Sequence, residues 1–324
     1  MDQIKAFTIP HRIVPAVRRA DLFNRIRSEH ERGALSNEIF NNYSRIFDCP
    51  PPTGFAPRSL IVGAVAHPRS RLPFILRNRR FFLRVSPSYI RYWNITRRVE
   101  QDLNMLLNPS GFQAQFARVP QKTLAVLSGL ALYGRNNLAY VPGLGSYHML
   151  VSYYSDRPAA PDGSWNRPRQ MDRCRQCQAC LKACPTGAIR SKAFPIRQDL
   201  CLTFYAGYSG PQELPSWLDP ALVEALVGCE VCQAVCPQNR AFRSLEAEEE
   251  GFSAEETEIL LANRTPENVP PTLRAKLERL GLSEFFGERE CLQMMASRLA
   301  IFIPRVESGA IPSEEIVSSR PSRA

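Results

Sequence analysis

Apolar residues in the first third of the chain follow the spacings of both helices and strands. The segment Val17 to Glu31 has apolar positions on one side, which predicts an amphipathic helix that stops near Gly33. The run Ser59 to His67 (SLIVGAVAH) is short, apolar and β-branched. It predicts a buried strand in a sheet that is covered on both faces. Residues 87–107 predict a further helix, which the breaker Asn-Pro-Ser-Gly at 108–111 ends.

The next part of the chain predicts a helix followed by two strands. Residues 120–132 (PQKTLAVLSGLAL) start with a proline, which suits a first helical turn, and the helix should end near residue 133. Residues 137–141 and 147–154 alternate as strands do and are joined by a Pro-Gly-Leu-Gly turn. These elements predict an α/β domain at residues 1–165, with helices on the faces of a mixed sheet.

The end of the chain is predicted to be helical. A helical region is expected at residues 241–305, after a cysteine-rich module at 166–240. Ser253 and Glu256 have the spacing of a capping box, which marks the start of a helix, and residues 288–303 predict a last helix. The tail at 306–324 is polar and is expected to be disordered.

Charge is unevenly distributed. The formal net charge is +10, and the stretch from Cys49 to Val99 contains no acidic residue. It carries ten arginines, which are Arg58, Arg69, Arg71, Arg77, Arg79, Arg80, Arg84, Arg91, Arg97 and Arg98. Such a segment suits the phosphates of a tRNA or a large anionic cofactor. It equally suits a solvated face whose arginine stems cover apolar surface.

The sequence offers no sign of membrane insertion or export. It has no apolar run of about 18 residues, the length that a membrane-spanning helix needs. Neither Arg18-Arg19 nor Arg79-Arg80 is followed by the apolar region of an export signal. We therefore expect a cytoplasmic protein with reduced thiols and no membrane association.

Cysteine spacing is the most specific feature of the sequence. The first run is Cys174, Cys177, Cys180 and Cys184, the second is Cys229, Cys232 and Cys236, and Cys201 lies between them. A proline follows the last cysteine of each run. Eight thiolates complete the ligand sets of two 4Fe–4S clusters, so residues 166–240 are expected to form a bacterial ferredoxin-like module with two clusters. The last cysteine of such a run usually ligates the other cluster, which assigns Cys236 to the first cluster and Cys184 to the second, with Cys201.

Other uses of these cysteines fit less well. Zinc sites place CxxC pairs about 15–20 residues apart rather than in a triple run followed by Cys-Pro. Disulfides would require an oxidising compartment. The remaining cysteines, Cys49 and Cys291, are expected to be ordinary buried thiols.

The cysteine module, together with a segment upstream of it, resembles epoxyqueuosine reductase. The matching parts are Cys174 to Ile189, Arg197 to Thr203 and Gly228 to Asn239, and the cluster layout is shared with corrinoid reductive dehalogenases. The stretch Leu124 to Asn137 (LAVLSGLALYGRNN) is similar to the "aGLGwiGKN" segment of that family. Similarity is good from about residue 120 to 240 and loose before that.

This resemblance implies a redox function. Two clusters would relay electrons from a ferredoxin or flavodoxin to a cobalamin in the N-terminal domain, which would act on an epoxide of a tRNA nucleoside. The implied corrinoid contacts are Gly134, Arg135, Asn136, Asn137, Gly143 and Gly145. The same residues also suit a helix stop and two simple turns.

One family feature is missing. Relatives carry an aspartate just upstream of the glycine-rich segment that is thought to donate a proton, whereas this chain has no carboxylate between Asp102 and Asp156. Epoxide opening needs an acid near the developing alkoxide, and Tyr133, Tyr140 and His148 are the candidates. Each of the three also suits a purely structural role.

Two other functions stay open at this point. The chain could be an electron carrier or reductive activator of another corrinoid protein, which the missing aspartate favours. It could also be a tRNA-binding module with structural clusters. The roughly 170 residues ahead of the clusters favour an enzyme, because a ferredoxin does not need them. The oligomeric state is not predicted.

Overall fold

The computed structural model describes residues 8–47, 51, 54–160, 165, 167–191, 194–208, 214–242 and 244–315. It divides the chain into two compact units that interleave along the sequence. Unit 1 contains Met1–Pro68, Tyr92–Phe204 and Val231–Ser244, and unit 2 contains Arg69–Arg91, Tyr205–Glu230 and Leu245–Ala324. Each unit therefore takes segments from several of the contiguous domains predicted from the sequence.

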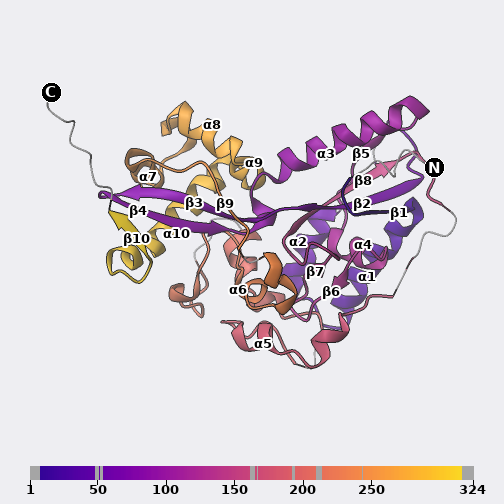
Figure 1. Ribbon diagram of the computed structural model, residues 1–324, viewed down its shortest axis with the longest axis horizontal. Helices are drawn as coiled ribbons and strands as arrows, with labels where there is room; N and C mark the ends of the chain where they lie inside the picture. Colours follow the sequence, from indigo (N-terminus) through magenta and orange to yellow (C-terminus); the bar gives the residue numbers. More distant parts are fainter. Residues whose placement is uncertain are drawn as a thin grey trace. The chain divides into compact units, whose positions relative to one another are not determined.

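Unit 1 is built on a four-stranded sheet with the order β1-β2-β8-β5 (Figure 1). The strands are β1 (His11–Pro15), β2 (Ser59–Ala66), β8 (His148–Ser155) and β5 (Ala114–Phe116), and the described pairings are antiparallel. The predicted strand at residues 59–67 is confirmed and is central, with Ile61 paired to Tyr153. Parallel pairing of strands occurs in unit 2, and unit 1 has an isolated parallel bridge between Tyr133 and Gln170.

Helices cover both faces of this sheet, as the apolar pattern of β2 predicts. Leu60 and Val62 pack in one cluster with residues of α1 (Arg19–Glu31) and α4 (Gln121–Leu127). Ile61 points to the other face and packs in a cluster with α3 (Tyr92–Leu107). Successive side chains of a strand alternate between faces, so one continuous apolar run fills both layers.

Two predicted helices have different bounds in the structure. The helix expected at 87–107 is interrupted, because Ile90 is extended and Arg91 has a φ of 54°. The helix expected at 120–132 ends at Leu127, because Gly129 adopts a φ of 76° and the N–H of Leu130 bonds back to Ala125. A left-handed glycine of this kind stops a helix.

The segment after α4 forms a short hairpin. Its strands are β6 (Leu132–Tyr133) and β7 (Ala139–Tyr140), which pair with each other. The predicted strand at 137–141 therefore pairs with the segment before it, whereas the predicted strand at 147–154 joins the main sheet as β8. Unit 1 also contains α2 (Asn37–Phe47), which the apolar pattern did not predict.

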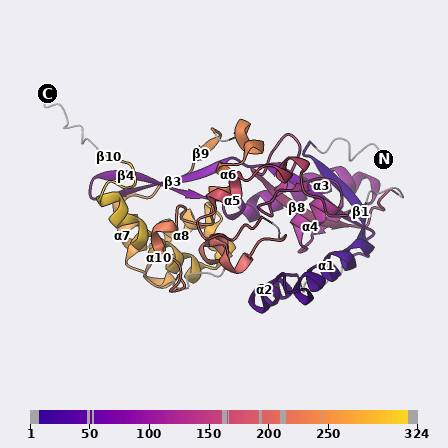
Figure 2. The same ribbon diagram turned by 90° about the horizontal axis from the view of Figure 1, so that it is seen from below.

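The cysteine region of unit 1 consists of short helical turns. These are η5 (Asp172–Arg175), α5 (Ala179–Ala183), η6 (Gln198–Leu200), α6 (Val231–Ala234) and η9 (Pro237–Phe242). Single 3-10 turns elsewhere in unit 1 are η2 (Ala16–Arg18) and η4 (Asn108–Ser110). Figure 2 shows α5 and α6 near each other, and the structure gives contacts between them.

Unit 2 packs a second sheet against helices. The sheet order is β10-β4-β3-β9, with β10 (Ser313–Glu315), β4 (Arg79–Val85), β3 (Arg69–Leu76) and β9 (Glu246–Glu248). The helices are α7 (Ala254–Leu261), α8 (Pro271–Arg279), α9 (Leu282–Phe286) and α10 (Glu288–Glu307). Short helical turns are η3 (Pro87–Tyr89), η7 (Phe204–Tyr208, which begins in unit 1), η8 (Pro220–Leu222) and η10 (Pro266–Asn268).

The C-terminal predictions are confirmed in part. Ser253 caps α7 through the predicted capping box with Glu256, and the last helix begins at Glu288 but continues to Glu307. The expectation of a disordered tail from residue 306 is wrong up to Glu315, because β10 pairs with the edge of β4. Residues 316–324 lie outside the described part of the chain. Within the described residues, no helix has the length and apolarity needed to cross a membrane.

Candidate metal-cluster site

The structure brings the last cysteine of the second run to the first run. Cys174, Cys177 and Cys236 lie near Cys180, and burial together with these neighbours raises the pKa of the Cys180 thiol to about 11. Burial likewise raises the pKa of Cys174, again with contributions from Cys236 and Cys177. The thiols of Cys174 and Cys180 are thus less readily ionised than usual, and a bound cation would reverse that effect.

A second group of cysteines lies in an apolar environment of unit 1. Cys184, Cys201 and Cys232 pack with the buried side chains of Ile189 and Ile196. Burial raises the pKa of the Cys201 thiol, and the nearby Cys184 raises it further. The remaining cysteine of the predicted set, Cys229, belongs to unit 2.

These thiols fit a cluster better than a single ion. Among the described residues, no three or more His, Cys, Asp or Glu side chains are close enough to share one metal ion. A four-iron cluster spans more space than one ion, because each thiolate binds a different iron. Of the two leftover cysteines, Cys291 is fully buried in α10 and burial raises its pKa to about 12, as expected of a structural thiol. Cys49 lies outside the described residues.

Lys122 places its amine near the second group of cysteines. It lies in the first turn of α4 and its ammonium donates to the carbonyl of Asn137 at 3.3 Å. Burial lowers its pKa, and the side chains of Cys201, Glu29 and Cys232 oppose that shift. Sequence reasoning missed this residue, although it is the only lysine between Lys5 and Lys182 in an arginine-rich chain.

Arg135 binds the backbone of the cysteine region. Its guanidinium donates to the carbonyl of Ser191 at 2.8 Å and to the carbonyl of Cys174. The resemblance assigned this residue to corrinoid contact, but here it fixes the start of the first cysteine run. A planar guanidinium with several donors suits such a bridging role.

The hairpin turn around Asn136 is packed tightly against Tyr140. The amide of Asn136 donates to the Tyr140 hydroxyl at 3.0 Å, and both residues are buried. A Cβ at Gly134 would lie 2.4 Å from the Asn136 side-chain oxygen and 2.5 Å from the Tyr140 ring. Asn137 follows with a φ of 62°. Gly134 is therefore needed for protein packing at this turn.

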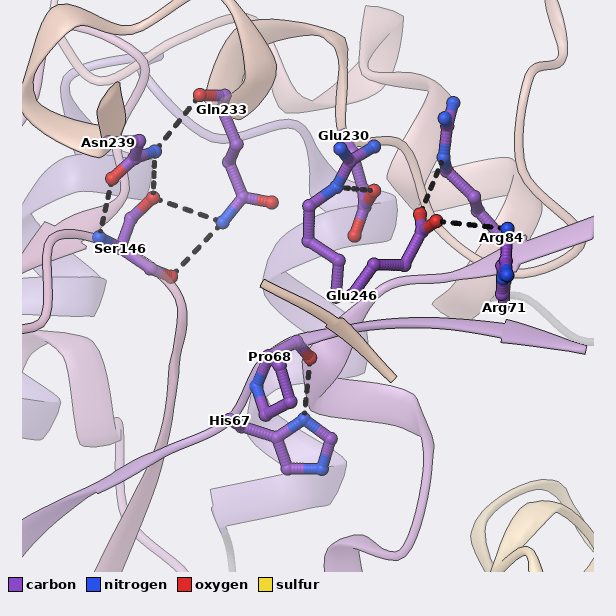
Figure 3. A network of polar contacts seen from close by, with 10 residues as sticks. His67, Pro68, Arg71, Arg84, Ser146, Glu230, Gln233, Asn239 and Glu246 are labelled. Atoms are coloured by element: carbon purple, nitrogen blue, oxygen red, sulfur yellow. Dashed lines mark hydrogen bonds and ion pairs between the residues drawn. The ribbon is translucent and has the colours of Figure 1, made fainter. Parts of the chain in front are cut away.

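The Pro-Gly-Leu-Gly turn contacts the second cysteine run. Ser146, directly after the turn, donates its backbone N–H to Asn239 at 2.9 Å, and its hydroxyl accepts from Asn239 at 2.8 Å and from Gln233 at 3.1 Å (Figure 3). A Cβ at Gly145 would lie 2.4 Å from the Asn239 side-chain oxygen, whereas Gly143 has open space around it. The lack of a side chain at Gly145 thus makes room for the side chain of Asn239, which belongs to the same unit.

The three candidate acids bond to three different protein groups. The Tyr133 hydroxyl bonds to that of Thr123 at 3.2 Å, and burial raises its pKa to about 12. His148 bonds through Nε2 to the carbonyl of Ala139 at 3.2 Å, and burial lowers its pKa to about 4. His148 is therefore neutral at pH 7 and donates its proton to a backbone oxygen. Tyr140 contacts Cys236, and burial and that contact raise its pKa.

The residues assigned to a corrinoid do not form an open cradle. Arg135, Asn136 and Gly145 are all used in contacts within unit 1. A cavity of about 440 Å³ lies along α3, lined by Arg97, Glu100, Gln101, Asn104, Met105 and Asn108. A second, of about 250 Å³, lies between the end of the β3–β4 hairpin and α10. Neither is lined by a residue that the resemblance assigned to corrinoid contact.

Most arginines of the basic stretch are paired with acidic residues of unit 2. Glu246 accepts from Arg84 at 3.2 Å and lies 3.7 Å from Arg71, as Figure 3 shows. Further ion pairs join Arg69 to Glu230, Arg71 and Arg80 to Glu248, Arg77 to Glu307 and Arg91 to Glu249. The guanidiniums of Arg71 and Arg80 also stack on Phe82. The structure thus favours the interpretation that these arginines pair with acidic residues and cover apolar surface. It does not favour an open face that binds phosphates.

Comparison with known proteins agrees with the cysteine geometry. Residues 173–239 match the family model of the 4Fe-4S double cluster binding domain. The epoxyqueuosine reductase of Pseudomonas aeruginosa is 34% identical over 142 residues, which are 42% of this chain and 37% of that protein. The chain thus spans little more than a third of the length of this curated relative.

Solved structures share the fold. The Bacillus subtilis epoxyqueuosine reductase, solved with its catalytic aspartate loop swung out of the active site, has a TM-score of 0.60 at 19% identity, covering 99% of this chain and 86% of that one. An epoxyqueuosine reductase with a modified tRNA stem loop has a TM-score of 0.58 at 18% identity, covering 93% and 80%. The chain therefore carries a 4Fe-4S double cluster binding domain within the fold of epoxyqueuosine reductases, and it resembles these enzymes in sequence around that domain.

Proposed function

We propose that this protein is an oxidoreductase that passes electrons through two 4Fe–4S clusters to a substrate site in the α/β part of the chain. The observation that carries this proposal is the double cluster domain, in which Cys236 returns to the first cysteine run. We assign Cys174, Cys177, Cys180 and Cys236 to one cluster, and Cys184, Cys201, Cys229 and Cys232 to the other.

The clusters, when bound, would accept and release single electrons. The chain contributes their position and environment. Arg135 holds the backbone at Cys174, and the bonds between Ser146, Asn239 and Gln233 hold the end of the second run. The Lys122 amine lies near Cys201 and Cys232, and burial lowers its pKa.

The proposed substrate is an epoxide on a modified tRNA nucleoside. Its support is the similarity to epoxyqueuosine reductases, one of which has been solved with a tRNA stem loop. A low-potential carrier such as a ferredoxin or flavodoxin would supply the electrons. Cobalamin enters this proposal through the resemblance alone, because the residues assigned to it are engaged inside unit 1.

A second candidate function is that of an electron carrier or reductive activator of another corrinoid protein. Two observations favour it: the sequence has no carboxylate between Asp102 and Asp156, and the three candidate acids bond to separate protein groups. A carrier needs no proton donor at a substrate, and it needs no corrinoid of its own.

Anaerobically reconstituted protein tests both candidates. We expect about eight irons and eight sulfides per chain, because eight cysteines match two ligand sets. Four irons per chain would reject the two-cluster assignment. The loaded protein is then titrated with cobalamin while its visible spectrum is followed, and it is assayed on epoxyqueuosine-containing tRNA with a low-potential reductant. Queuosine formation supports the enzyme. Full clusters with no cobalamin spectrum and no turnover support the carrier.

A further inference from the structure

Exposed basic side chains flank the first cysteine run of unit 1. Between residues 167 and 191 the sequence has a single acidic residue, Asp172. The basic residues of this segment are all exposed, and they are Arg167, Arg169, Arg173, Arg175, Lys182 and Arg190. Within the described part of the chain, only Arg175 among them forms an ion pair, with Asp172 at 3.2 Å. Most arginines of the stretch at 58–98, by contrast, are paired with glutamates.

The start of this segment is fixed on strand β6. The backbone N–H of Tyr133 donates to the carbonyl of Arg169 at 2.9 Å, and the N–H of Met171 donates to the carbonyl of Tyr133 at 2.9 Å. Tyr133 and Gln170 form a parallel bridge, so the residues that precede them, Leu132 and Arg169, lie side by side. Leu132 is apolar and yet 40% exposed. Protein interfaces combine such apolar side chains with a polar rim.

The end of the segment is held beside the first cysteine. The guanidinium of Arg135 donates to the carbonyl of Ser191 at 2.8 Å and also to the carbonyl of Cys174. One side chain thus joins the two ends of the first run. Arg190, which precedes Ser191, is thereby brought close to the arginines on both sides of Cys174. Helix α5 adds a lysine between the third and fourth cysteines. We call this surface the basic patch, and it consists of Arg169, Arg173, Arg175, Lys182 and Arg190.

We infer that the basic patch is the docking surface for the electron donor, an acidic carrier protein of low potential. The inference rests on the proposed function, in which Cys174 and Cys177 ligate one cluster. Both cysteines are only half-buried and lie in the same segment as the patch. A carrier seated there is close to that cluster, and electron transfer slows steeply with distance. One electron leaves the reduced carrier and enters the oxidised cluster, and no bond forms or breaks.

The charge of the patch suits a brief encounter of this kind. Opposite charges on two surfaces steer the partners together and raise mainly the rate of association. The phosphates of a nucleic acid would be attracted as well. The position of the patch around the cysteine run favours the electron carrier, because a nucleic acid has no need to approach a cluster.

Arg169→Glu/Arg190→Glu reverses two charges of the patch and leaves the residues next to the assigned ligands unchanged. Arg12→Glu/Arg118→Glu is the matched control, because these arginines are exposed elsewhere in unit 1 and the net charge changes equally. Each loaded protein is mixed anaerobically with a reduced, acidic flavodoxin, and cluster reduction is followed by stopped-flow absorbance. At low salt we expect the patch variant to react about tenfold more slowly than the control. High salt should remove the difference. Equal rates at low salt would overturn the inference.

A small neutral reductant, photoreduced deazaflavin, reports separately on the proposed function. It needs no docking surface, so it should reduce the clusters of the unaltered protein and both variants equally fast. Two reducible clusters with equal flavodoxin rates would reject the docking surface and leave the electron-transfer proposal standing. Clusters that neither reductant reduces would reject both. If the patch variant instead lost affinity for tRNA and kept the flavodoxin rate of the control, the surface would belong to a nucleic acid.

A second measurement needs no substitution. Lys182 is the one lysine of the patch, and a carbodiimide joins a lysine to a carboxylate that it contacts. The loaded, unaltered protein is treated with the carbodiimide in the presence of the flavodoxin, and cross-linked peptides are identified by mass spectrometry. We expect a cross-link at Lys182 that is lost at high salt. Its absence would overturn the inference even if the patch variant cannot hold its clusters.

Discussion

The three predicted proton donors are buried side chains, and burial determines their pKa values. Tyr133, Tyr140 and His148 are the predicted proton donors, yet each has a partner inside the chain. Their pKa values move away from neutrality because burial disfavours the charged form of each group. These shifts move all three pKa values further from pH 7, where a general acid works best.

His148 should make the protein less stable in mild acid. Its folded pKa of about 4 lies below the ordinary value of 6.5, so between these values only the unfolded chain takes up the proton. Above pH 6.5 this histidine does not change the free energy of unfolding. As the pH falls to 4, it lowers that free energy by about 3 kcal/mol. His148→Gln keeps a donor for Ala139 and cannot titrate. Urea unfolding of both loaded proteins from pH 7.5 to 4 should therefore show a shallower decline for the variant. Parallel curves would contradict this account.

At the scale of elements, tight turns hold the cysteine runs in place. The β6–β7 turn presents Arg135 to the backbone of Cys174, and the turn before Ser146 presents that serine to Asn239. Both turns use glycines where a Cβ would meet a neighbouring side chain, at Gly134 and Gly145. Their glycine-rich sequences resemble ligand-binding loops, but the tight approach at each is to protein atoms.

Gly145→Ala should loosen the second cysteine run, and Gly143→Ala is its matched control. Both glycines have a positive φ, 61° and 80°, so both substitutions cost about 1 kcal/mol in backbone strain. Only the alanine at 145 would meet Asn239, at 2.4 Å, and disturb its bonds to Ser146. We expect a further loss of about 1–2 kcal/mol from that disruption. Denaturant unfolding and the rate of iron release to a chelator measure it. Equal losses of unfolding free energy in the two variants would show that Asn239 moves aside without losing its bonds.

At the scale of the whole molecule, distant acidic residues neutralise the basic stretch. Strands β3 and β4 carry arginines on the face of unit 2 that is turned away from its apolar core, and β9 aligns Glu246 and Glu248 in parallel with Arg69 and Arg71. Two stretches of opposite charge, separated by more than 150 residues, thus meet in one sheet. Any tRNA contact is then expected to depend on other surfaces.

Arg80→Glu tests this neutralisation. The new carboxylate would face Glu248, so we expect a loss of about 1 kcal/mol in unfolding free energy. Arg79→Glu is the control, because the described contacts give Arg79 no ion pair, and its loss should be smaller. tRNA affinity should keep its salt dependence in both variants. If Arg80 instead contacted a phosphate, the slope of log affinity against log salt would become shallower by about 0.7 to 0.9.

The sequence by itself determined the parts whose signals are local. The cysteine spacing predicted the double cluster domain, because a short loop must supply several thiolates to one cluster. The apolar run at 59–67 predicted the central strand, and the pair Ser253 and Glu256 predicted a helix start. Each of these features depends on residues within a few positions of one another.

Only the tertiary structure decided the pairings between distant residues. The β3–β4 hairpin was not predicted, although its inward positions alternate and its turn residues Arg77 and Asn78 have positive φ values. In the sequence its arginines have no acidic residue nearby, which indicated a phosphate-binding surface. Their acidic partners lie on β9, far along the chain. Likewise, Tyr140 meets Cys236 and Lys122 approaches Cys201 only after the chain has folded. Local periodicity carries no information on such contacts, because a strand or an ion pair takes its partner from any part of the chain that packing brings close.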